Sequence, residues 1–226
     1  MKVSYMKEYR KNELKNYVIG NILVIILLSG VLDLIYAHCG NDIDVLKILA
    51  SALLRAAILS SVMYIYVYIL DSMVPSKFKD EFVYFLSGRP GDTIFEKILE
   101  PGVDARFTPD DAQKRYKDFY AELNQMIDKK QKKRLQNSKW YGIYQSVETN
   151  ETVRLSQQDF LLNRDMCIIS IEILFLYVVL LLFSSGFTIK MTVVGWIIIE
   201  IVITKIAAMS KAKRFAFNVI TKDIHN

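Results

Sequence analysis

The feature that most constrains this chain is an apolar run at residues 45–70, VLKILASALLRAAILSSVMYIYVYIL, which contains Arg55. The hydrocarbon core of a bilayer is about 30 Å thick and needs about 20 apolar helical residues to cross it, so this run predicts a membrane span. An arginine at that depth costs at least about 2.5 kcal/mol and marks a functional or paired site. Arg55 is therefore either a structural charge with a buried partner or a residue that faces a polar path. Both interpretations predict an integral membrane protein.

The remaining apolar residues are also concentrated in blocks. They lie at 17–36, 166–183 and 191–209, which with the first run gives four blocks. Four such blocks predict four transmembrane helices in two hairpins. The predicted fold class is a mainly α membrane protein in which two helical hairpins flank a mostly helical cytoplasmic domain. The predicted segments are an N-terminal segment (1–16), hairpin 1 (17–70), a ligand-sensing domain (71–163), hairpin 2 (164–210) and a tail (211–226).

The basic residues predict the orientation of the spans. Lysines and arginines are frequent before the first block, and Lys211, Lys213 and Arg214 follow the fourth, whereas residues 38–44 contain none. Because cytoplasmic flanks carry the excess of basic residues, both termini and the middle segment are predicted to be cytoplasmic. The first block is longer than a signal-peptide core and a second block follows almost at once, so we expect it to be retained as a span.

Five ionisable residues inside the predicted spans are candidates for a pore or gate. At 1.5 Å per residue, Asp33 and Arg55 each lie roughly 25 Å from the inner end of their span, a depth match that predicts an ion pair. Glu172 and Lys205 match in the same way at about 10 Å. Glu200 has no obvious partner in its own hairpin, although Arg55 could approach it. So many charges predict a polar interior between the helices.

The cysteines and histidines argue against a metal site and against a disulfide. Cys39 and Cys167 are predicted at opposite faces of the bilayer, and so are His38 and His225. A bilayer separates each pair, which excludes a disulfide or a shared metal within the chain. We also find no nucleophile with a base and no nucleotide-binding loop, so we expect no cofactor and no enzymatic activity.

The middle segment opens with a turn that is a candidate anion site. Pro75 is expected to end the second span, and GRPGDTIFEKIL begins at Gly88. Thr93 with Glu96 fits a capping box that opens a short helix. A helix start beside Arg89 suits a phosphate group, because free backbone N–H groups and the helix dipole favour anions. A plain structural turn is the alternative interpretation.

A long helix is predicted to begin with Thr108 as N-cap and Pro109 at the first helical position. The sequence TPDDAQKRYKDFYAELNQMIDKKQKKRLQ runs from 108 to 136, with acidic residues early and basic residues late, as the helix dipole favours. Apolar side chains at intervals of three and four predict a buried stripe. Its members are Tyr116, Phe119, Tyr120, Leu123, Met126 and Ile127.

The end of this segment combines dense positive charge with aromatic rings. Such a combination binds a phosphodiester backbone while the rings stack on bases. The alternative is a basic loop attracted to anionic lipid, with its aromatic side chains packed in the domain core. Residues 147–165 are expected to form a turn or short hairpin and then a helix into the third span. The candidate ligand-binding residues are Arg89, Lys132, Lys133, Arg134, Trp140 and Tyr141.

The order of these parts resembles a known class of proteins. A basic first span, an insert containing RPGDTIF and QNSKWYGIY, and FLLNRD before a second hairpin are similar to the small bacterial membrane effectors of nucleotide-signalling antiphage systems. Among these, the chain looks most like the Hailong-type channel. The resemblance implies a homotetrameric channel in the inner membrane, with an oligonucleotide or cyclic nucleotide ligand made by a partner nucleotidyltransferase. In the Hailong type the ligand closes the channel, whereas related CBASS effectors are opened by theirs.

Two functions from different classes follow. The first is a nucleotide-gated ion channel or pore-forming effector of antiphage defence that disrupts the inner membrane. The second is a non-conducting membrane adaptor that docks a soluble protein partner. A proton-coupled transporter fits less well, because short spans without broken helices are unlike the transporter folds.

Overall fold

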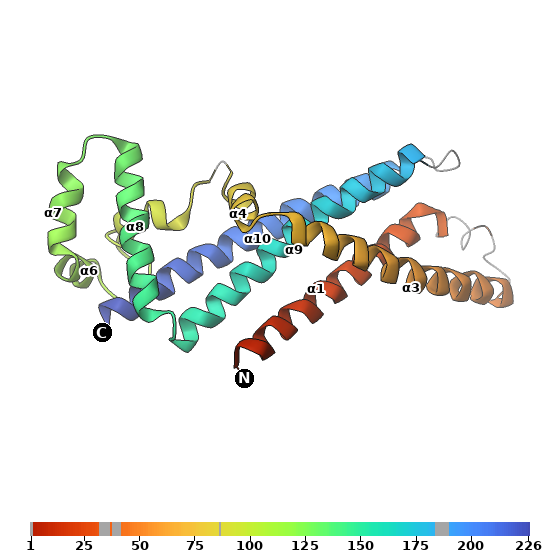
Figure 1. Cartoon of the computed structure of the whole chain (residues 1–226), viewed down its shortest axis with the longest axis horizontal. Coiled ribbons are helices and arrows are strands. Elements are labelled where there is room, and N and C mark those ends of the chain that lie inside the picture. The colour runs from red at the N-terminus through yellow and green to blue at the C-terminus, as the bar shows by residue number, and fades with distance from the viewer. Residues whose placement is uncertain (1, 32–36, 38–41, 86, 184–189) are drawn as a thin grey trace. The chain divides into compact units, whose positions relative to one another are not determined.

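The computed structural model describes residues 2–31, 37, 42–85, 87–183 and 190–226 (Figure 1). It is 86% helical, and its described residues contain no β-strand. The chain forms two compact units, one from residues 1–80 and 162–206 and the other from residues 81–161 and 207–226. We call the first the span unit and the second the head unit. Residues 207–226, which include the predicted tail at 211–226, belong to the head unit.

Four long helices supply the span unit. They are α1 (Lys2–Ile26), α3 (Asp42–Met73) and the parts of α9 (Glu151–Phe183) and α10 (Met191–Ile224) that fall within it. The predicted N-terminal segment and the first part of the first predicted span, as far as Ile26, form one continuous helix, α1. A short π-helical turn, η1 (Leu27–Val31), follows α1, and its Gly30 has φ 126°, a region that favours glycine.

Three stretches are long and apolar enough to cross a membrane, which indicates a membrane protein. They are Lys11–Gly30, Val45–Met73 and Met191–Ile224, and they overlap three of the four predicted spans. The fourth predicted span, at 166–183, lies within α9, and the count of four spans stays a prediction. Met73 ends α3 just before Pro75, and α4 (Ser76–Tyr84) begins directly after it, as expected from the missing N–H of proline.

The interior of the span unit is an apolar cluster to which all four helices contribute. Val18 and Ile22 of α1, Val67 of α3, Ile173 of α9 and Ile197 of α10 are almost completely buried in it. The segment of α9 that was predicted to be a span therefore packs with the three apolar stretches. Large apolar side chains also remain exposed on the outer faces of α3 and α10, among them Leu53, Leu54, Ile58, Ile65, Ile198, Ile199, Val202 and Ile203.

The head unit consists of short helices packed around the end of α10. In chain order they are η2 (Pro90–Asp92), α5 (Ile94–Lys97), α6 (Pro109–Arg115), α7 (Lys117–Gln125) and α8 (Lys129–Val147). The predicted cap of the long helix is confirmed, because the Thr108 hydroxyl accepts a hydrogen bond from the Asp111 N–H at 3.2 Å. Asp111 in turn accepts the Thr108 N–H at 2.9 Å.

The prediction of one helix over 108–136 is wrong, because the chain breaks at two points. Tyr116 leaves helical geometry (φ −112°, ψ 26°) between α6 and α7, and Met126 is extended after α7. Asp128 then starts α8, since its carboxylate accepts the Lys130 N–H at 2.9 Å. The lysines after Asp128 consequently stand at the start of α8, where the helix dipole is unfavourable to cations.

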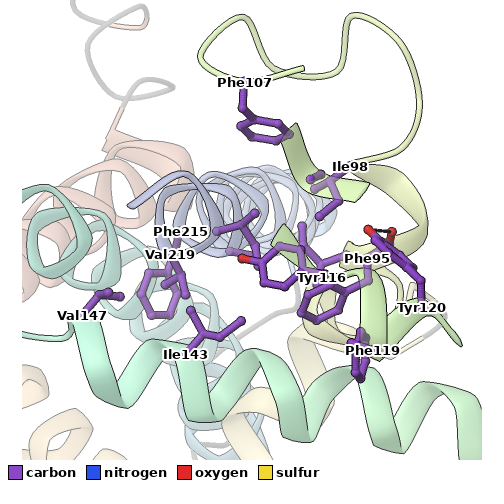
Figure 2. Packing of buried hydrophobic residues seen from close by; sticks show 14 of the residues in the cluster. Phe95, Ile98, Phe107, Tyr116, Phe119, Tyr120, Ile143, Val147, Phe215 and Val219 are labelled. Atoms are coloured by element: carbon purple, nitrogen blue, oxygen red, sulfur yellow. Dashed lines mark hydrogen bonds between the residues drawn. The ribbon is translucent and has the colours of Figure 1, made fainter. Parts of the chain in front are cut away.

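Aromatic side chains form the core of the head unit (Figure 2). The Phe95 ring is fully buried and lies 4.6 Å from the Phe119 ring and 5.1 Å from the Tyr116 ring, measured between centroids. The Tyr120 hydroxyl donates to the Phe95 carbonyl at 2.8 Å. Of the predicted stripe, Tyr116, Phe119, Tyr120 and Leu123 are buried, whereas Ile127 is 98% exposed because α7 has already ended.

The ends of α9 and α10 complete the head unit. Asn150 precedes α9, and its side-chain oxygen accepts the Thr152 N–H at 3.1 Å, so the helix begins directly without the short hairpin that the sequence left open. From α10, Phe215, Ala216, Val219 and Ile220 enter the aromatic core. These positions recur at helical spacing, a signal in the predicted tail that the sequence analysis did not use.

Candidate functional site

Arg89 lies at a small basic pocket of the head unit. The pocket has a volume of about 220 Å³ and is lined by residues of α4, η2, α5 and α10 together with the loop that joins α4 to η2. Its lining includes two further cations, Lys97 and Lys213, and two hydroxyl residues, Ser87 and Thr93. The sequence singled out Arg89, but nothing in it indicated that Lys213, more than a hundred residues away, would line the same cavity. Thr93 precedes α5, yet its side chain makes no capping hydrogen bond, so the predicted capping box with Glu96 is not formed.

The turn that carries Arg89 packs tightly on α8. A Cβ atom added at Gly91 would lie 2.6 Å from the Asn137 side-chain oxygen and 3.3 Å from the Trp140 ring. Glu96 accepts a hydrogen bond from the Gln136 amide at 3.1 Å and so ties the following helix to α8 as well. The two sequence motifs of the predicted ligand site, one around Arg89 and one around Trp140, therefore meet in space.

Trp140 itself has a structural position. Its ring packs edge-on against Phe215 at 5.4 Å and stacks on Tyr144 at 5.9 Å, and its N–H donates to the Ala216 carbonyl at 3.3 Å. These contacts support the alternative that the aromatic residues pack in the domain core. Tyr141 is different, because its side chain is 53% exposed and can contact a ligand.

The basic cluster lies on the first turns of α8. Lys133 and Arg134 are exposed and Lys132 is half-buried. The cluster and the basic pocket are separate features, since none of these three residues lines the pocket. Because these cations stand at the positive end of the helix dipole, together they create a positive potential that attracts anions.

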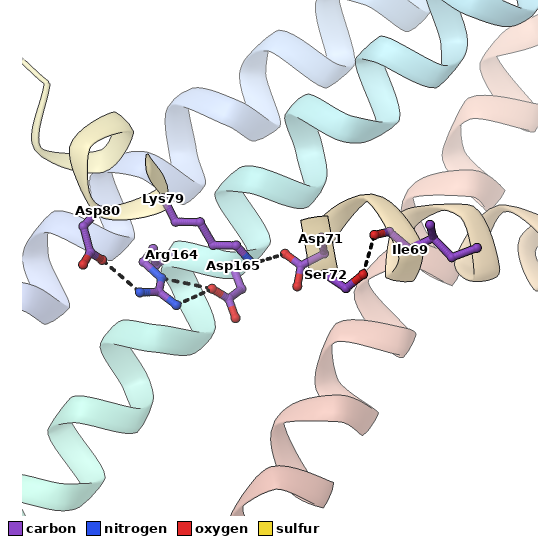
Figure 3. Close-up of polar contacts among 7 residues, drawn as sticks. All are labelled: Ile69, Asp71, Ser72, Lys79, Asp80, Arg164 and Asp165. Carbon is purple, nitrogen blue, oxygen red and sulfur yellow. Dashed lines mark hydrogen bonds and ion pairs between the residues drawn. The ribbon is translucent and has the colours of Figure 1, made fainter. Parts of the chain in front are cut away.

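A chain of ion pairs lies in the span unit where α3, α4 and α9 meet (Figure 3). The Arg164 guanidinium is buried between Asp165, at 2.9 Å, and Asp80, also at 2.9 Å. The buried ammonium group of Lys79 pairs with Asp71. In the sequence, Arg164 and Asp165 mark only the entrance to the third predicted span, because Asp80, the second partner of Arg164, comes from a different part of the chain.

Glu172 lies about two turns further along α9, and it is only 7% exposed. Neither carboxylate oxygen accepts a hydrogen bond from any described residue. The charged residues that interact electrostatically with the Glu172 carboxyl group are Asp71 and Lys79. The predicted pair with Lys205 is therefore not formed, because matching depth on two helices does not require that the two side chains face each other.

Glu200 of α10 has a partner that the sequence analysis missed. The Tyr17 hydroxyl of α1 donates to the Glu200 carboxylate at 2.9 Å and lies 2.7 Å from the Ser170 hydroxyl of α9. A second polar link joins the Trp196 N–H of α10 to the Asn21 side chain of α1 at 3.2 Å. Both links cross between helices inside the span unit.

The other predicted pore residues differ in their surroundings. Asp33 lies outside the described residues. Arg55 is exposed on α3 and forms no ion pair with a described residue, so the expected approach to Glu200 is not seen. Lys205 is half-buried on α10.

A third polar group joins the end of α10 to α6 in the head unit. Asp223 accepts hydrogen bonds from Arg115 at 3.0 Å and from the Tyr116 hydroxyl at 2.8 Å. Burial and the Asp223 charge raise the pKa of Tyr116 well above its usual range, so its hydroxyl stays protonated as a donor. We assign a structural role to this group, because it holds α6 against α10 and none of its three residues lines the basic pocket.

No protein-family model matches this chain, and comparison with curated proteins and with solved structures finds no similar protein. The resemblance to bacterial antiphage effectors therefore stays a hypothesis.

Proposed function

We propose that this chain is a subunit of a ligand-gated ion channel in a bacterial inner membrane. The span unit would form the pore, both termini would be cytoplasmic, and the head unit would bind an anionic nucleotide ligand made by a partner nucleotidyltransferase. Opening of such a pore would depolarise an infected cell, as the resemblance to antiphage effectors implies. The chain would act as a homo-oligomer, with a tetramer as the expected form.

The observation that carries this proposal is the buried carboxyl group of Glu172. Its two oxygens lack a hydrogen-bond partner among the described residues, and the helices around it pack mainly through apolar side chains. An ionisable group inside a membrane bundle is expensive and is typical of ion or substrate pathways. A hydrated path beside α9 would solvate this carboxyl group, which a dry bundle cannot do.

Two further features support a multi-subunit channel. The hydroxyl groups of Tyr17 and Ser170 place polar atoms beside Glu200 between three helices. Leu53, Leu54 and Ile58 of α3 are exposed on a single chain, and an apolar face of this size requires lipid or another subunit as its neighbour.

Ion flux through reconstituted protein tests the proposal. We expect wild-type protein in liposomes to pass ions in at least one of two conditions, without additive or with AMP. Glu172→Gln, Arg55→Ala and Glu200→Ala should each change the flux, while Glu148→Gln, a matched change at an exposed position of the head unit, should not. If wild-type protein passes no ions in either condition, or if all variants conduct equally, the pore assignment is wrong.

The second candidate function is the non-conducting adaptor. It is favoured by a groove of about 610 Å³ that residues of α7 and α8 line, among them Asp118, Glu122 and Lys139. A groove of mixed charge on two short helices suits a segment of a protein partner. The adaptor predicts a stable complex that forms without nucleotide and no current in planar bilayers.

A further inference from the structure

The basic pocket of the head unit has the composition of a phosphate site. Arg89, Lys97 and Lys213 contribute three positive charges to one cavity of about 220 Å³, and no acidic residue is among its lining residues. Tyr84, Met209 and Pro90 supply apolar surface beside them. Arg89 and Lys213 are exposed and Lys97 is half-buried. An anion bound in the cavity would be attracted by all three cations and would offset the repulsion among them.

These three cations are also uncompensated within the described part of the chain. Three other basic side chains of the head unit have a carboxylate partner: Arg106 pairs with Asp104, Arg115 with Asp223 and Lys211 with Asp159. Arg89, Lys97 and Lys213 form no ion pair with any described residue. Lys211 and Lys213 lie only two positions apart on α10, yet Lys211 has a carboxylate partner and Lys213 has none among the described residues.

The walls of the pocket are held in place before any ligand binds. The turn after Arg89 is fixed because Gly91 packs against Asn137 and Trp140 of α8. Tyr84 stacks on Phe160 with 5.9 Å between ring centroids, and Met209 packs against the same small cluster as Tyr84. When the walls of a cavity are already fixed, ligand binding costs little free energy for ordering the protein.

Size and charge together define the ligand class. A cavity of about 220 Å³ is smaller than the roughly 300–1,000 Å³ typical of sites that enclose a whole small molecule, so it suits one end of a ligand. A phosphate monoester carries about −1.5 to −2 charges at neutral pH and three strong acceptor oxygens. Arginine, lysine and hydroxyl donors match these oxygens better than they match the single charge of a diester.

We propose that the cavity lined by Arg89, Lys97 and Lys213 binds a terminal phosphate monoester, with the Ser87 and Thr93 hydroxyls as additional donors. This inference deepens the proposed function, because it names the group by which the head unit would hold its ligand. The same chemistry is present at the end of a nucleotide and in the headgroup of phosphatidic acid.

Binding to the purified full-length chain in detergent tests this inference without any measurement of ion flux. The probes are AMP against adenosine, and short-chain phosphatidic acid against short-chain phosphatidylcholine. We expect AMP, phosphatidic acid or both to bind, and the two probes without a monoester not to bind. Arg89→Gln and Lys213→Gln should each weaken binding about tenfold or more, which is the size expected for one charge-assisted contact.

Arg214→Gln is the matched control, since Arg214 is the exposed neighbour of Lys213 on α10 but does not line the pocket. Its binding should equal that of the wild type, and thermal melting of each variant confirms that the head unit is folded. The inference is overturned if neither monoester binds, or if Arg214→Gln weakens binding as much as Lys213→Gln. Binding without flux would refute the channel alone, and flux without binding would refute the pocket alone.

Discussion

The head unit and the span unit differ in what they bury without a hydrogen-bond partner among the described residues. The head unit leaves single side-chain atoms of Gln136, Arg154 and Thr221, and the span unit leaves both oxygens of one carboxyl group. In the head unit the polar ends of the core aromatic side chains form hydrogen bonds. The Tyr120 hydroxyl donates to the Phe95 carbonyl, and the Trp140 N–H donates to the Ala216 carbonyl. In the span unit the whole carboxyl group of Glu172 is buried without a hydrogen bond from a described residue. A buried carboxyl group without a hydrogen bond is costly and is seldom kept for stability. The unpaired carboxyl group of Glu172 therefore sets the span unit apart from the head unit.

The largest expected effect comes from removing the ring at the centre of the head unit. Phe95→Ala should lower the free energy of unfolding of the head unit by about 3–5 kcal/mol, because it leaves a cavity among fully packed rings. The two tryptophans allow the units to be followed separately, since Trp140 packs in the head unit and Trp196 in the span unit. Urea unfolding followed by fluorescence in Trp196→Phe and Trp140→Phe backgrounds makes this measurement.

The comparison predicts that only the Trp140 signal shifts to lower urea in Phe95→Ala. Ile197→Ala, a buried substitution in the span unit, is the reciprocal control and should shift the Trp196 signal instead. If both signals move together in both variants, the two units unfold as one and have no separate free energies of unfolding to compare.

The ion-pair chain of the span unit gives the next effect. Arg164→Met should destabilise the span unit by about 3 kcal/mol or more, because the buried Asp165 carboxylate would lose the guanidinium group that pairs with it. Lys211→Met breaks the pair with Asp159, whose two side chains are 36% and 50% exposed, and should cost only about 0–1 kcal/mol. Urea unfolding of both variants is the measurement. Equal effects would mean that burial of the Arg164 pairs is not retained in solution.

The expectations that proved correct depend on short stretches of sequence. The cap at Thr108 followed by Pro109, the end of α3 before Pro75 and the first part of the buried stripe are all set by neighbouring residues. The apolar stretches are equally local, because length and composition alone make a helix long enough to cross a membrane. Asp128 was a local signal that the sequence analysis missed, since an aspartate before lysines is a typical helix start.

The candidate sites could not be predicted to the same extent, because they are made by contacts between distant segments. The meeting of Arg89 with Lys213, the burial of Trp140 against Phe215 and the bond from Tyr17 to Glu200 depend on tertiary packing. Depth along a helix predicts one coordinate of a side chain and leaves its direction around the axis open. For this reason Glu172 and Lys205 match in depth but do not pair.

The turn at Gly91 gives a smaller effect that sharpens the description of the head unit. Gly91→Ala should destabilise it by about 1–3 kcal/mol, because the added methyl group overlaps the Asn137 oxygen and crowds the Trp140 ring. Gly142→Ala on α8 is the control. A Cβ there meets nothing within 4 Å, and alanine favours a helix interior, so it should be neutral or stabilising by up to about 1 kcal/mol.

Asn137→Ala should partly rescue Gly91→Ala, because it removes the nearer of the two obstructing groups. Urea unfolding followed by Trp140 fluorescence measures all three variants. A neutral Gly91→Ala would mean that the turn can move away from α8, and the fixed walls inferred for the basic pocket would then be wrong.

The smallest effect is a dependence of head-unit stability on pH. Hydrogen bonds from the Arg106 side chain hold the pKa of Asp104 below its ordinary value of 3.8. A carboxyl group whose folded-state pKa is depressed contributes stability that is complete above the ordinary value and is lost as the pH falls through the folded value. Because the Arg106 side chain is 45% exposed, solvent screening limits this contribution to at most about 1 kcal/mol.

Asp104→Asn should therefore be less stable than the wild type at pH about 5. The difference should shrink at pH about 3, because the Asp104 carboxyl group is then largely protonated in the unfolded chain and its charged form in the folded protein contributes less stability. Arg106→Gln removes the cause of the lowered pKa and should flatten the same part of the pH dependence. Urea midpoints of the three proteins at the two pH values test this. A difference that grows as the pH falls would contradict the sign, and would mean that the Asp104 carboxyl group is not stabilised in its charged form by Arg106.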